Sequence, residues 1–454
     1  MRLKRGIGRA GIGVTAAVVL SGVAAMPQLA SVPRPARPVA ARTVVTVRPQ
    51  VTVPSAHPSA NLPGGYTPAQ IRAAYYVNPL LRSGINGKGT SIVIVDSFGS
   101  PTIRSDLAVF DREFKLKTPQ LSIIHPAGAI PKFSSSNSTM DNWADETTLD
   151  VEWSHVMAPD AKIVLVETPT SENEGTSGFP QILKAEEYVI AHHLGGVISQ
   201  SFGATEQTFP KGAVRPLRSA YIEAAQPAHD ITVLAASGDA GASDLRTNES
   251  LYYTYPVTEW PASDPLVTAV GGLDLRLDAL GRRIAPDQVW NDAGPPPSAG
   301  GGGKSIIFGR PSYQNGVASV VGNHRGVPDV SMSASCRHAV DIYESFDGSG
   351  WDLICGTSEA TPLLAGVIAL ANQVAGRPLG PINSYLYKMA AQHDPGITDI
   401  THGNNSVLVS QNGKQYTVKG WDAVPGYDLA SGVGTIVAKY FVPELAALAK
   451  KSGA

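Results

Sequence analysis

The sequence predicts an α/β protein whose central sheet is mainly parallel and is covered by helices on both faces. The first reason is a series of short apolar runs rich in β-branched residues, as in strands that are buried on both faces. These runs are Ser91–Val95, Lys162–Val166, Val197–Ser199, Ile231–Ala235 and Leu266–Val270. The second reason is that helix-like stretches alternate with the runs, which is typical of parallel sheets. They cover Glu146–Val156, Gln181–His193 and Leu217–Ala225.

Length and composition fit one large globular domain or two ordinary ones. The chain has 454 residues, of which 43% are hydrophobic and 16% charged, and its formal net charge is −2. No basic cluster follows the first ten residues. We therefore expect no nucleic-acid partner, because such partners require a basic surface.

The N-terminus is typical of a secretory signal peptide, in which a basic start precedes an apolar stretch, here over about 11–25. We expect cleavage after Ala25, with Ala30 as a second position. The alternative is an uncleaved membrane anchor, although the stretch is shorter than the roughly 20 apolar residues of a spanning helix. Cleavage predicts a secreted, extracellular protein that is free of the membrane.

Residues 26–63 are rich in Pro, Ala, Val and Arg and predict an extended linker. The folded domain is expected over 64–445, followed by a tail at 446–454. It opens with a helix start, because Thr67 can cap the helix, Pro68 suits its first turn and Gln70 completes a capping box.

Cys336 and Cys355 are the two cysteines of the chain. In an oxidising compartment they could pair and constrain the segment that leads to Ser358. The alternative is two buried free thiols.

Ser358 is the first candidate catalytic residue. It stands in Gly356-Thr357-Ser358, directly before an apolar helix-like stretch. A serine at a helix start has backbone N–H groups and the positive end of the helix dipole nearby, which favour a developing oxyanion. The alternative is a serine that only caps its helix.

A nucleophilic serine needs a base. We expect the best-placed histidines of the chain to be structural or exposed. They are His155, His192, His193 and His402. Glu146 and Asp150 offer another base, because their i, i+4 spacing places both carboxyls on one helix face. Two such carboxyls share one proton and titrate as a unit. The alternative is a solvated acidic face.

Asp239 follows the apolar run 231–235 in Ser237-Gly238-Asp239. The C-terminal end of a parallel strand is where α/β proteins form their sites. A protonated carboxyl there can donate a hydrogen bond to an oxyanion. The alternative is an ordinary turn.

Together these segments resemble the sedolisin family, the serine-carboxyl peptidases with a subtilisin-like fold. The resemblance covers about residues 64–445 and rests on motifs that occur in the family's order. The motifs are Glu146 with Asp150, Ala158-Pro159-Asp160-Ala161, Ser199-Gln200-Ser201-Phe202-Gly203, Ser237-Gly238-Asp239, Val270-Gly271-Gly272, Gly301-Gly302-Gly303, Val327-Pro328-Asp329-Val330 and Gly356-Thr357-Ser358. The implied fold is a subtilisin-like three-layer sandwich.

The resemblance implies that Ser358 is the nucleophile and Glu146 the general base and later the acid. Asp150 would orient Glu146, and Asp239 would supply the oxyanion donor together with the Ser358 N–H. The implied activity is hydrolysis of proteins or peptides through an acyl-enzyme, with a maximum at about pH 3 to 5 because these carboxyls must hold protons. The substrate cleft would be lined by Ser201, Phe202 and Gly203.

The resemblance also implies one structural calcium ion. Its ligands would be the carboxylates of Asp399 and Asp422 and the carbonyls of Ile400, Val418 and Gly420, all of them hard oxygen donors. The family usually has glycine where Val418 stands, so this carbonyl serves only if valine adopts the required backbone angles. The alternative is a plain turn around Gly420.

Three features depart from the family pattern. The usual large propeptide does not separate the expected signal from residue 64, Ala240 replaces a frequent serine, and Glu359 follows the nucleophile where small residues are usual. Position i+1 of a helix points away from position i, so we expect Glu359 to do little harm. Three other functions stay open: a Ser-His-Asp peptidase with a neutral optimum, a tripeptidyl exopeptidase of the same family, and a secreted binding protein without activity. By analogy we expect a monomer.

Overall fold

The computed structural model describes residues 64–172 and 174–452. The predicted signal peptide at 1–25 and linker at 26–63 lie outside the described residues. At the start of the described part, Thr67 and Gln70 form the predicted capping box of the first helix. No helix of the described part is long and apolar enough to cross a membrane.

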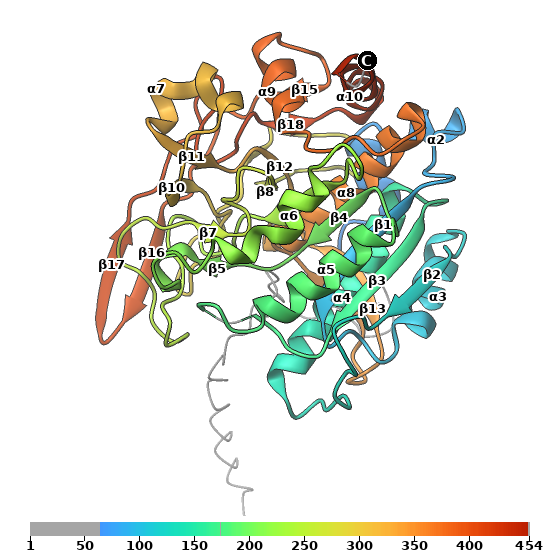
Figure 1. Cartoon of the computed structure of the whole chain (residues 1–454), viewed down its shortest axis with the longest axis horizontal. Coiled ribbons are helices and arrows are strands. Elements are labelled where there is room, and N and C mark those ends of the chain that lie inside the picture. Colours follow the sequence, from blue (N-terminus) through green and yellow to red (C-terminus); the bar gives the residue numbers. More distant parts are fainter. Residues whose placement is uncertain (1–63, 173, 453–454) are drawn as a thin grey trace, which may run out of the picture. The chain divides into compact units, whose positions relative to one another are not determined.

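The centre of the described part is an eight-stranded sheet (Figure 1). Seven strands follow one path, and each neighbouring pair on that path is parallel. In path order they are β12 (Val330–Ser333), β8 (Thr268–Asp274), β6 (Thr232–Ala236), β4 (Val197–Gln200), β1 (Ser91–Ser97), β3 (Lys162–Thr168) and β2 (Leu121–Ile124). The eighth strand, β9 (Gln288–Val289), is antiparallel to β8. Each predicted run overlaps a strand of this sheet, which confirms the predicted fold class.

The alternation of side chains along β1 shows why helices cover both faces of the sheet. Ile92 and Ile94 pack into one apolar cluster, which includes side chains of α3, α4, α8 and α10. Val93 and Val95 pack into a second cluster with α5 and α6, which cross in front of the strands in Figure 1. Because successive strand side chains point to opposite faces, an apolar run buries both of them. The result is the predicted three-layer sandwich.

The helices of the described part differ widely in length. They are α1 (Pro68–Ala74), α2 (Asn78–Arg82), α3 (Ile103–Phe114), α4 (Ser138–Met157), α5 (Phe179–Ala191), α6 (Ser219–Ala224), α7 (Ala318–Val321), α8 (Thr357–Ala375), α9 (Asn383–Ala391) and α10 (Ala438–Ser452). α4 begins eight residues before Glu146, where the helix was predicted to start, because Asn137 caps it by accepting hydrogen bonds from the Thr139 and Met140 N–H groups.

Five two-stranded pairings of the described part lie outside the sheet. They are β5 (Ala204–Thr205) with β7 (Glu259–Trp260), β10 (Gly303–Gly309) with β11 (His324–Val327), β13 (Val340–Glu344) with β14 (Gly350–Ile354), β15 (Ile397–Thr398) with β18 (Thr435–Ile436), and β16 (Val407–Gln411) with β17 (Lys414–Val418).

The predicted tail at 446–454 is wrong for its described residues. α10 continues through 446–452 and packs against α8. Ala446, Leu448 and Ala449 are buried, so the apolar face of the helix belongs to the core. The domain therefore extends at least to Ser452.

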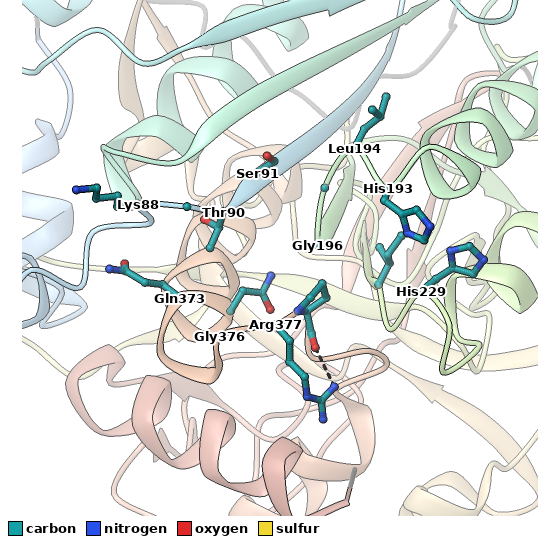
Figure 2. Close-up of a pocket in the computed structure, with 15 residues that line it drawn as sticks. Lys88, Thr90, Ser91, His193, Leu194, Gly196, His229, Gln373, Gly376 and Arg377 are labelled. Atoms are coloured by element: carbon teal, nitrogen blue, oxygen red, sulfur yellow. Dashed lines mark hydrogen bonds between the residues drawn. The ribbon is translucent and has the colours of Figure 1, made fainter. Parts of the chain in front are cut away.

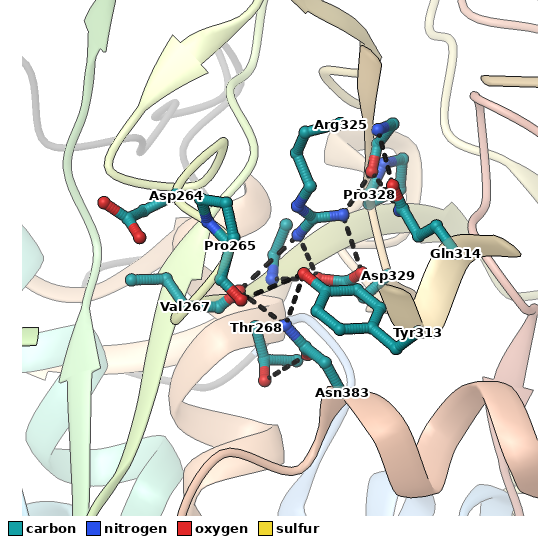
Figure 3. Close-up of polar contacts among 12 residues, drawn as sticks. Asp264, Pro265, Val267, Thr268, Tyr313, Gln314, Arg325, Pro328, Asp329 and Asn383 are labelled. Carbon is teal, nitrogen blue, oxygen red and sulfur yellow. Dashed lines mark hydrogen bonds and ion pairs between the residues drawn. The ribbon is translucent and has the colours of Figure 1, made fainter. Parts of the chain in front are cut away.

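A buried ion pair fixes the edge of the sheet beside β12 (Figure 3). Arg325 and Asp329 are both 0% exposed, and the guanidinium binds the carboxylate through two nitrogens. Asp329 also accepts hydrogen bonds from the Ala269 N–H at 2.8 Å and the Tyr387 hydroxyl at 2.9 Å. Every lone pair that burial removes from water has a donor here, so the Val327–Val330 motif has a structural explanation.

Candidate active site

The predicted catalytic side chains meet at the C-terminal ends of the parallel strands, where α/β folds place their sites. Ser201 directly follows β4 and Asp239 follows β6 by three residues. Ser358 is the second residue of α8, and Glu146 and Asp150 lie within α4, which packs against α8. Two helices and two strand ends therefore converge on one point.

Ser358 is completely buried and directed at Glu146. Its Oγ donates a hydrogen bond of 3.0 Å to Glu146 Oε2, and a longer contact of 3.4 Å reaches the Ser201 carbonyl. Gly356 precedes α8 at φ 125°, a backbone angle that L side chains rarely adopt. This turn allows the serine to enter the first turn of the helix with its N–H group free of an intrahelical partner.

Glu146 and Asp150 are buried without a cation among their described contacts. Burial, followed by the charge of Asp150 and then of Asp96, raises the pKa of Glu146 well above its ordinary value. Burial and then the charge of Asp96 raise the pKa of Asp150 likewise. Ser201 Oγ donates to Asp150 Oδ1 at 2.9 Å and so fixes that carboxyl. The pair therefore retains a proton to higher pH than exposed carboxyls do.

Asp239 lies against the first residue of α8. Its Oδ1 accepts hydrogen bonds of 2.8 Å from both the N–H and the hydroxyl of Thr357. The Thr357 hydroxyl in turn accepts from the Gly238 N–H at 3.2 Å. These contacts place the Asp239 carboxyl one residue from the Ser358 N–H.

Asp96 is a member of the site that sequence reasoning missed. It lies near the end of β1 and is 1% exposed. Burial first, with the charge of Glu167 adding and a hydrogen bond from Thr147 opposing, raises its pKa to about 8. The signal was present in Val95-Asp96-Ser97, a carboxyl after an apolar run, as at Asp239. Asp96 thus adds a third carboxyl to the Glu146–Asp150 pair.

The segment Ser201–Gly203 has a more divided role than the prediction gave it. Ser201 contacts Asp150 through its hydroxyl and Ser358 through its carbonyl. The ring of Phe202 is 0% exposed and packs against Trp143 and Phe179, so this side chain cannot line a cleft. A Cβ atom at Gly203 would lie 2.5 Å from Glu259 Oε2, so the Glu259 side chain would have to shift. Any contact of Phe202 with substrate would involve its backbone.

The histidines lie away from Ser358, as expected. His155 is completely buried and pairs with Asp111 at 3.1 Å. His192, His193 and His402 are exposed. The hydrogen bonds described for Ser358 Oγ go to Glu146 and to a carbonyl, and none goes to a histidine.

Two features flank the nucleophile. Cys336 and Cys355 form a disulfide, which connects the segment after β12 to the turn before Ser358. Glu359 does not point into solvent: its side chain is 0% exposed, which the sequence did not suggest. Burial raises the pKa of Glu359 to about 8, with the Ser333 hydroxyl opposing and the charge of Asp239 adding.

The predicted calcium ligands lie on two segments that run side by side. Asp422 forms a β-bridge with Asn404, and the Ala423 N–H donates to the Gly403 carbonyl at 3.0 Å. Val418 lies in β17 and is not among the described non-glycine residues with positive φ, so valine is compatible with this backbone. The donor set of two carboxylates and three carbonyls suits calcium chemically. The described residues contain no cluster of three or more His, Cys, Asp or Glu suited to a metal ion.

A cavity of about 330 Å³ lies at the N-terminal ends of the central strands, opposite the ends that carry the Ser358 site (Figure 2). Its lining includes Ser91 at the start of β1 and Gly196 directly before β4. His193 and His229 stack on one side of it at 5.0 Å. No predicted catalytic residue lines this cavity, so it is separate from the Ser358 site.

Comparison with known proteins agrees with this geometry. The model of the family described as "Subtilase family" matches residues 125–388, more than half of the chain. The solved structure of Pseudomonas sedolisin, a serine-carboxyl proteinase complexed with two molecules of pseudo-iodotyrostatin, covers 87% of this chain and 100% of its own at a TM-score of 0.70. The two sequences are 23% identical, so this likeness concerns the fold.

Curated relatives are similar over much of the described domain. Kumamolisin from Bacillus sp. (strain MN-32) is 31% identical over 82% of this chain and 62% of its own length. Tripeptidyl-peptidase sed4 from Aspergillus fumigatus is 29% identical over 73% of this chain and 58% of its own. Tripeptidyl-peptidase 1 from Homo sapiens is 29% identical over 64% of this chain and 50% of its own length. The chain spans less than two thirds of each of these relatives.

Proposed function

Since the chain belongs to the subtilase family and to its sedolisin group, we propose that it is an acid-acting serine-carboxyl endopeptidase. The observation that carries the proposal is the buried hydrogen bond of 3.0 Å between Ser358 Oγ and Glu146 Oε2. A serine nucleophile needs a base within this distance, and a carboxyl occupies the place that histidine usually takes. The substrates are proteins or peptides, and the enzyme acts as a monomer.

In the first step, Ser358 Oγ attacks the carbonyl carbon of the scissile peptide while its proton passes to Glu146. The carbonyl π electrons move onto oxygen, and this oxyanion accepts hydrogen bonds from the Ser358 N–H and from protonated Asp239. Collapse of the tetrahedral intermediate breaks the C–N bond, and Glu146 returns the proton to the leaving amine. An acyl group then remains on Ser358.

In the second step, water replaces the amine. Glu146 accepts a proton from water as the water oxygen attacks the acyl carbon, and the C–O bond to Ser358 then breaks with the proton returning to Oγ. Asp150 and Asp96 support this exchange, because the three buried carboxyls resist ionising together and so keep a proton that they share. Rising pH removes this proton and the one on Asp239, so activity is highest in acid.

The first test is cleavage of a denatured protein between about pH 2 and 8, beside the Ser358→Ala variant. Acid-peaked activity that disappears in the variant supports the proposal. Asp239→Asn tests the oxyanion role, and unchanged activity of this variant in acid would contradict it. A folded wild-type protein without activity at any pH would favour a binding protein on the same fold.

A tripeptidyl exopeptidase is the second candidate, because two of the relatives are named tripeptidyl-peptidases. The two activities differ in their need for a free substrate N-terminus. Cleavage of peptides with acetylated N-termini at an undiminished rate favours the endopeptidase. Loss of cleavage on acetylation, with release of tripeptides from the free peptides, favours the exopeptidase.

The proposal includes one structural Ca²⁺. Asp399 and Asp422 would hold it with the carbonyls of Ile400, Val418 and Gly420, and the ion would join the 399–403 and 418–422 segments by electrostatic attraction. Calcium at 100 times its dissociation constant would raise the free energy of unfolding by about 2.7 kcal/mol. Thermal unfolding with calcium and with EGTA measures this difference, and Asp422→Asn should abolish it. If the midpoint of thermal unfolding of the wild type is the same with calcium and with EGTA, the calcium site is contradicted.

The proposal also places the mature enzyme outside the cell, on the basis of the basic and apolar pattern at the N-terminus. Expression in a secreting host followed by N-terminal sequencing tests this. Protein recovered from the medium should begin after Ala25 or Ala30. Retention of the intact N-terminus in the membrane fraction would instead support an anchor.

A further inference from the structure

The segment 290–301 follows β9 and contacts the active site from two sides, although the proposed reaction uses none of its residues. Its one carboxylate is Asp292, whose side chain is 11% exposed. The Asp292 N–H donates a hydrogen bond of 2.9 Å to the Ser298 carbonyl. This bond closes the loop between the two residues and brings Asp292 close to Ala299.

Backbone hydrogen bonds hold the turn that contains Asp239 against this segment. The Ala299 N–H donates to the Asp239 carbonyl at 2.9 Å. The Gly301 N–H donates to the Gly238 carbonyl at 2.7 Å. The position of the Asp239 carboxyl, the proposed oxyanion donor, therefore depends on where this segment lies.

The Asp292 side chain binds a different part of the site, the residues around Cys336. Its Oδ2 accepts hydrogen bonds from the Cys336 N–H at 2.9 Å and from the Trp290 indole N–H at 2.6 Å. Its Oδ1 accepts from the Ser335 hydroxyl at 2.8 Å and lies 3.5 Å from Arg337 Nε. One carboxylate therefore holds the residues on both sides of Cys336.

The Cys336–Cys355 disulfide extends this connection to the turn before Ser358. Cys355 is 0% exposed and stands three residues before Ser358. Beside the disulfide, the Gly356 N–H donates at 2.9 Å to the carbonyl of the residue that follows β12. The start of the nucleophile turn is thus fixed by a covalent bond and by a backbone hydrogen bond.

The two turns also meet directly, because Asp239 Oδ1 accepts hydrogen bonds of 2.8 Å from the N–H and the hydroxyl of Thr357. The contacts therefore form a closed ring, which passes from Asp239 through the 290–301 segment, Asp292 and the Cys336–Cys355 disulfide back to Thr357. A catalytic site needs its groups within about 0.5 Å of the productive geometry, and surrounding contacts of this kind supply that precision.

We propose that Asp292 is a positioning residue of the active site and that the Cys336–Cys355 disulfide transmits its effect to Ser358. This inference rests on the proposed function. The ring sets the Ser358 N–H relative to the Asp239 carboxyl, the two groups that receive the oxyanion. Because Asp292 and the disulfide act through the backbone, their loss should lower turnover and leave substrate binding largely unchanged.

The first test compares Asp292→Ala with Asp292→Asn in the full chain. Alanine removes every acceptor, so at about pH 4 we expect kcat to fall about tenfold with KM within about twofold, since small displacements of a nucleophile lower turnover strongly. Asparagine preserves the contacts, because its oxygen accepts from the Cys336 and Trp290 N–H groups while its NH2 group donates to Ser335. We expect Asp292→Asn to keep kcat within about threefold of the wild type.

The second test removes the disulfide by combining Cys336→Ala with Cys355→Ala. We expect a similar loss of kcat, and adding Asp292→Ala should lower it by less than about threefold more, because both changes break the same ring. A water-soluble trialkylphosphine should reproduce the loss in folded wild type once thiol titration shows that the disulfide is reduced, even if the variant fails to fold. The double variant contains no cysteine, so the phosphine should leave its activity unchanged.

Asp278→Ala is the matched control. Asp278 also binds two backbone N–H groups and an arginine, but it lies in the surface turn 278–282 beside α1. This variant should leave kcat unchanged. The inference is overturned if Asp292→Ala keeps the wild-type kcat, if its loss lies in KM alone, or if reduced wild type keeps full turnover. A wild type that is inactive at every pH overturns the proposed function and this inference together, whereas an active wild type with those results overturns the inference alone.

Discussion

Asp329 and Asp150 are both 0% exposed, yet their surroundings are opposite. Asp329 faces the Arg325 guanidinium and has two further donors at 2.8 and 2.9 Å. Asp150 receives a hydrogen bond from Ser201, but the charge that raises its pKa, after burial, is that of another carboxyl, Asp96. The first carboxylate is paired with a cation. The pKa of the second is raised, because burial and then the charge of Asp96 disfavour its ionised form.

This difference separates a structural site from one that is suited to chemistry. The paired charges of Arg325 and Asp329 hold the edge of the sheet through direct hydrogen bonds. Uncompensated buried carboxyls retain a proton that they can share and transfer, which general acid–base catalysis needs. Burial by itself therefore identifies neither kind of site, and the sign of the neighbouring charges does.

Substitution of Glu146 should give the largest effect, and in opposite directions for activity and stability. Glu146→Gln removes the base from Ser358, so we expect kcat/KM to fall about 10³-fold. The same change removes a carboxyl from a crowded acidic cluster, so the free energy of unfolding at neutral pH should rise. Steady-state kinetics and urea unfolding measure the two quantities. Activity within tenfold of the wild type would contradict the assigned base.

Substitution of Asp329 should lower stability and leave activity per folded molecule unchanged. Asp329→Asn leaves the buried Arg325 without a counter-charge, and we expect the free energy of unfolding to fall by about 3 to 5 kcal/mol. Urea unfolding at constant pH measures it.

The matched control for this prediction is the double variant Arg325→Met with Asp329→Asn, which removes both charges. It should recover much of the loss, because replacing both partners avoids an unpaired charge. If the double variant is as unstable as the single one, the lost hydrogen bonds rather than the charge of Arg325 explain the effect.

The local part of this contrast could be predicted from the sequence. The spacing of Glu146 and Asp150 and the turn before Ser358 are short-range patterns, and the structure brings these side chains together as expected. The parallel strands were also predictable, because burial on both faces leaves apolar runs. These features depend on residues that are neighbours in the chain.

The remaining part depends on contacts between segments that are distant in the chain. Asp96 joins the cluster because α4 packs against β1, and Glu359 is buried because α8 packs among α4, α10 and strands of the sheet. The assignment of 446–454 to a tail failed for the same reason, since Leu448 is buried by α8 packing. Local patterns carry no information on which distant residue will cover a side chain.

Glu186 gives a third prediction, since it is an uncompensated carboxyl outside the active site. Burial raises its pKa to about 8, and Gln200 donates a hydrogen bond to it. Its contribution to stability is therefore complete below about pH 4.3 and is lost as pH rises through about 8. Glu186→Gln should reduce the loss of unfolding free energy between about pH 5 and 8 by on the order of 3 kcal/mol.

Urea unfolding at the two pH values, for the wild type and Glu186→Gln, measures that loss. Activity in acid should be unaffected, because Glu186 lies in α5 on the other face of the sheet from α8. Parallel pH dependence of the two proteins would mean that the glutamate is already ionised when buried.

The smallest effect should come from an ion pair at the surface, Lys117 with Asp160. Their side chains are 79% and 26% exposed, and the ammonium lies 2.8 Å from the carboxylate. Solvent screens this attraction, and Asp160 keeps a hydrogen bond of 2.7 Å from Asn86 when the lysine is removed. Lys117→Ala should therefore change the free energy of unfolding by less than about 1 kcal/mol, and less still in high salt. A loss as large as that of Asp329→Asn would show that ion pairing matters here regardless of burial, and would remove the distinction between the two buried sites.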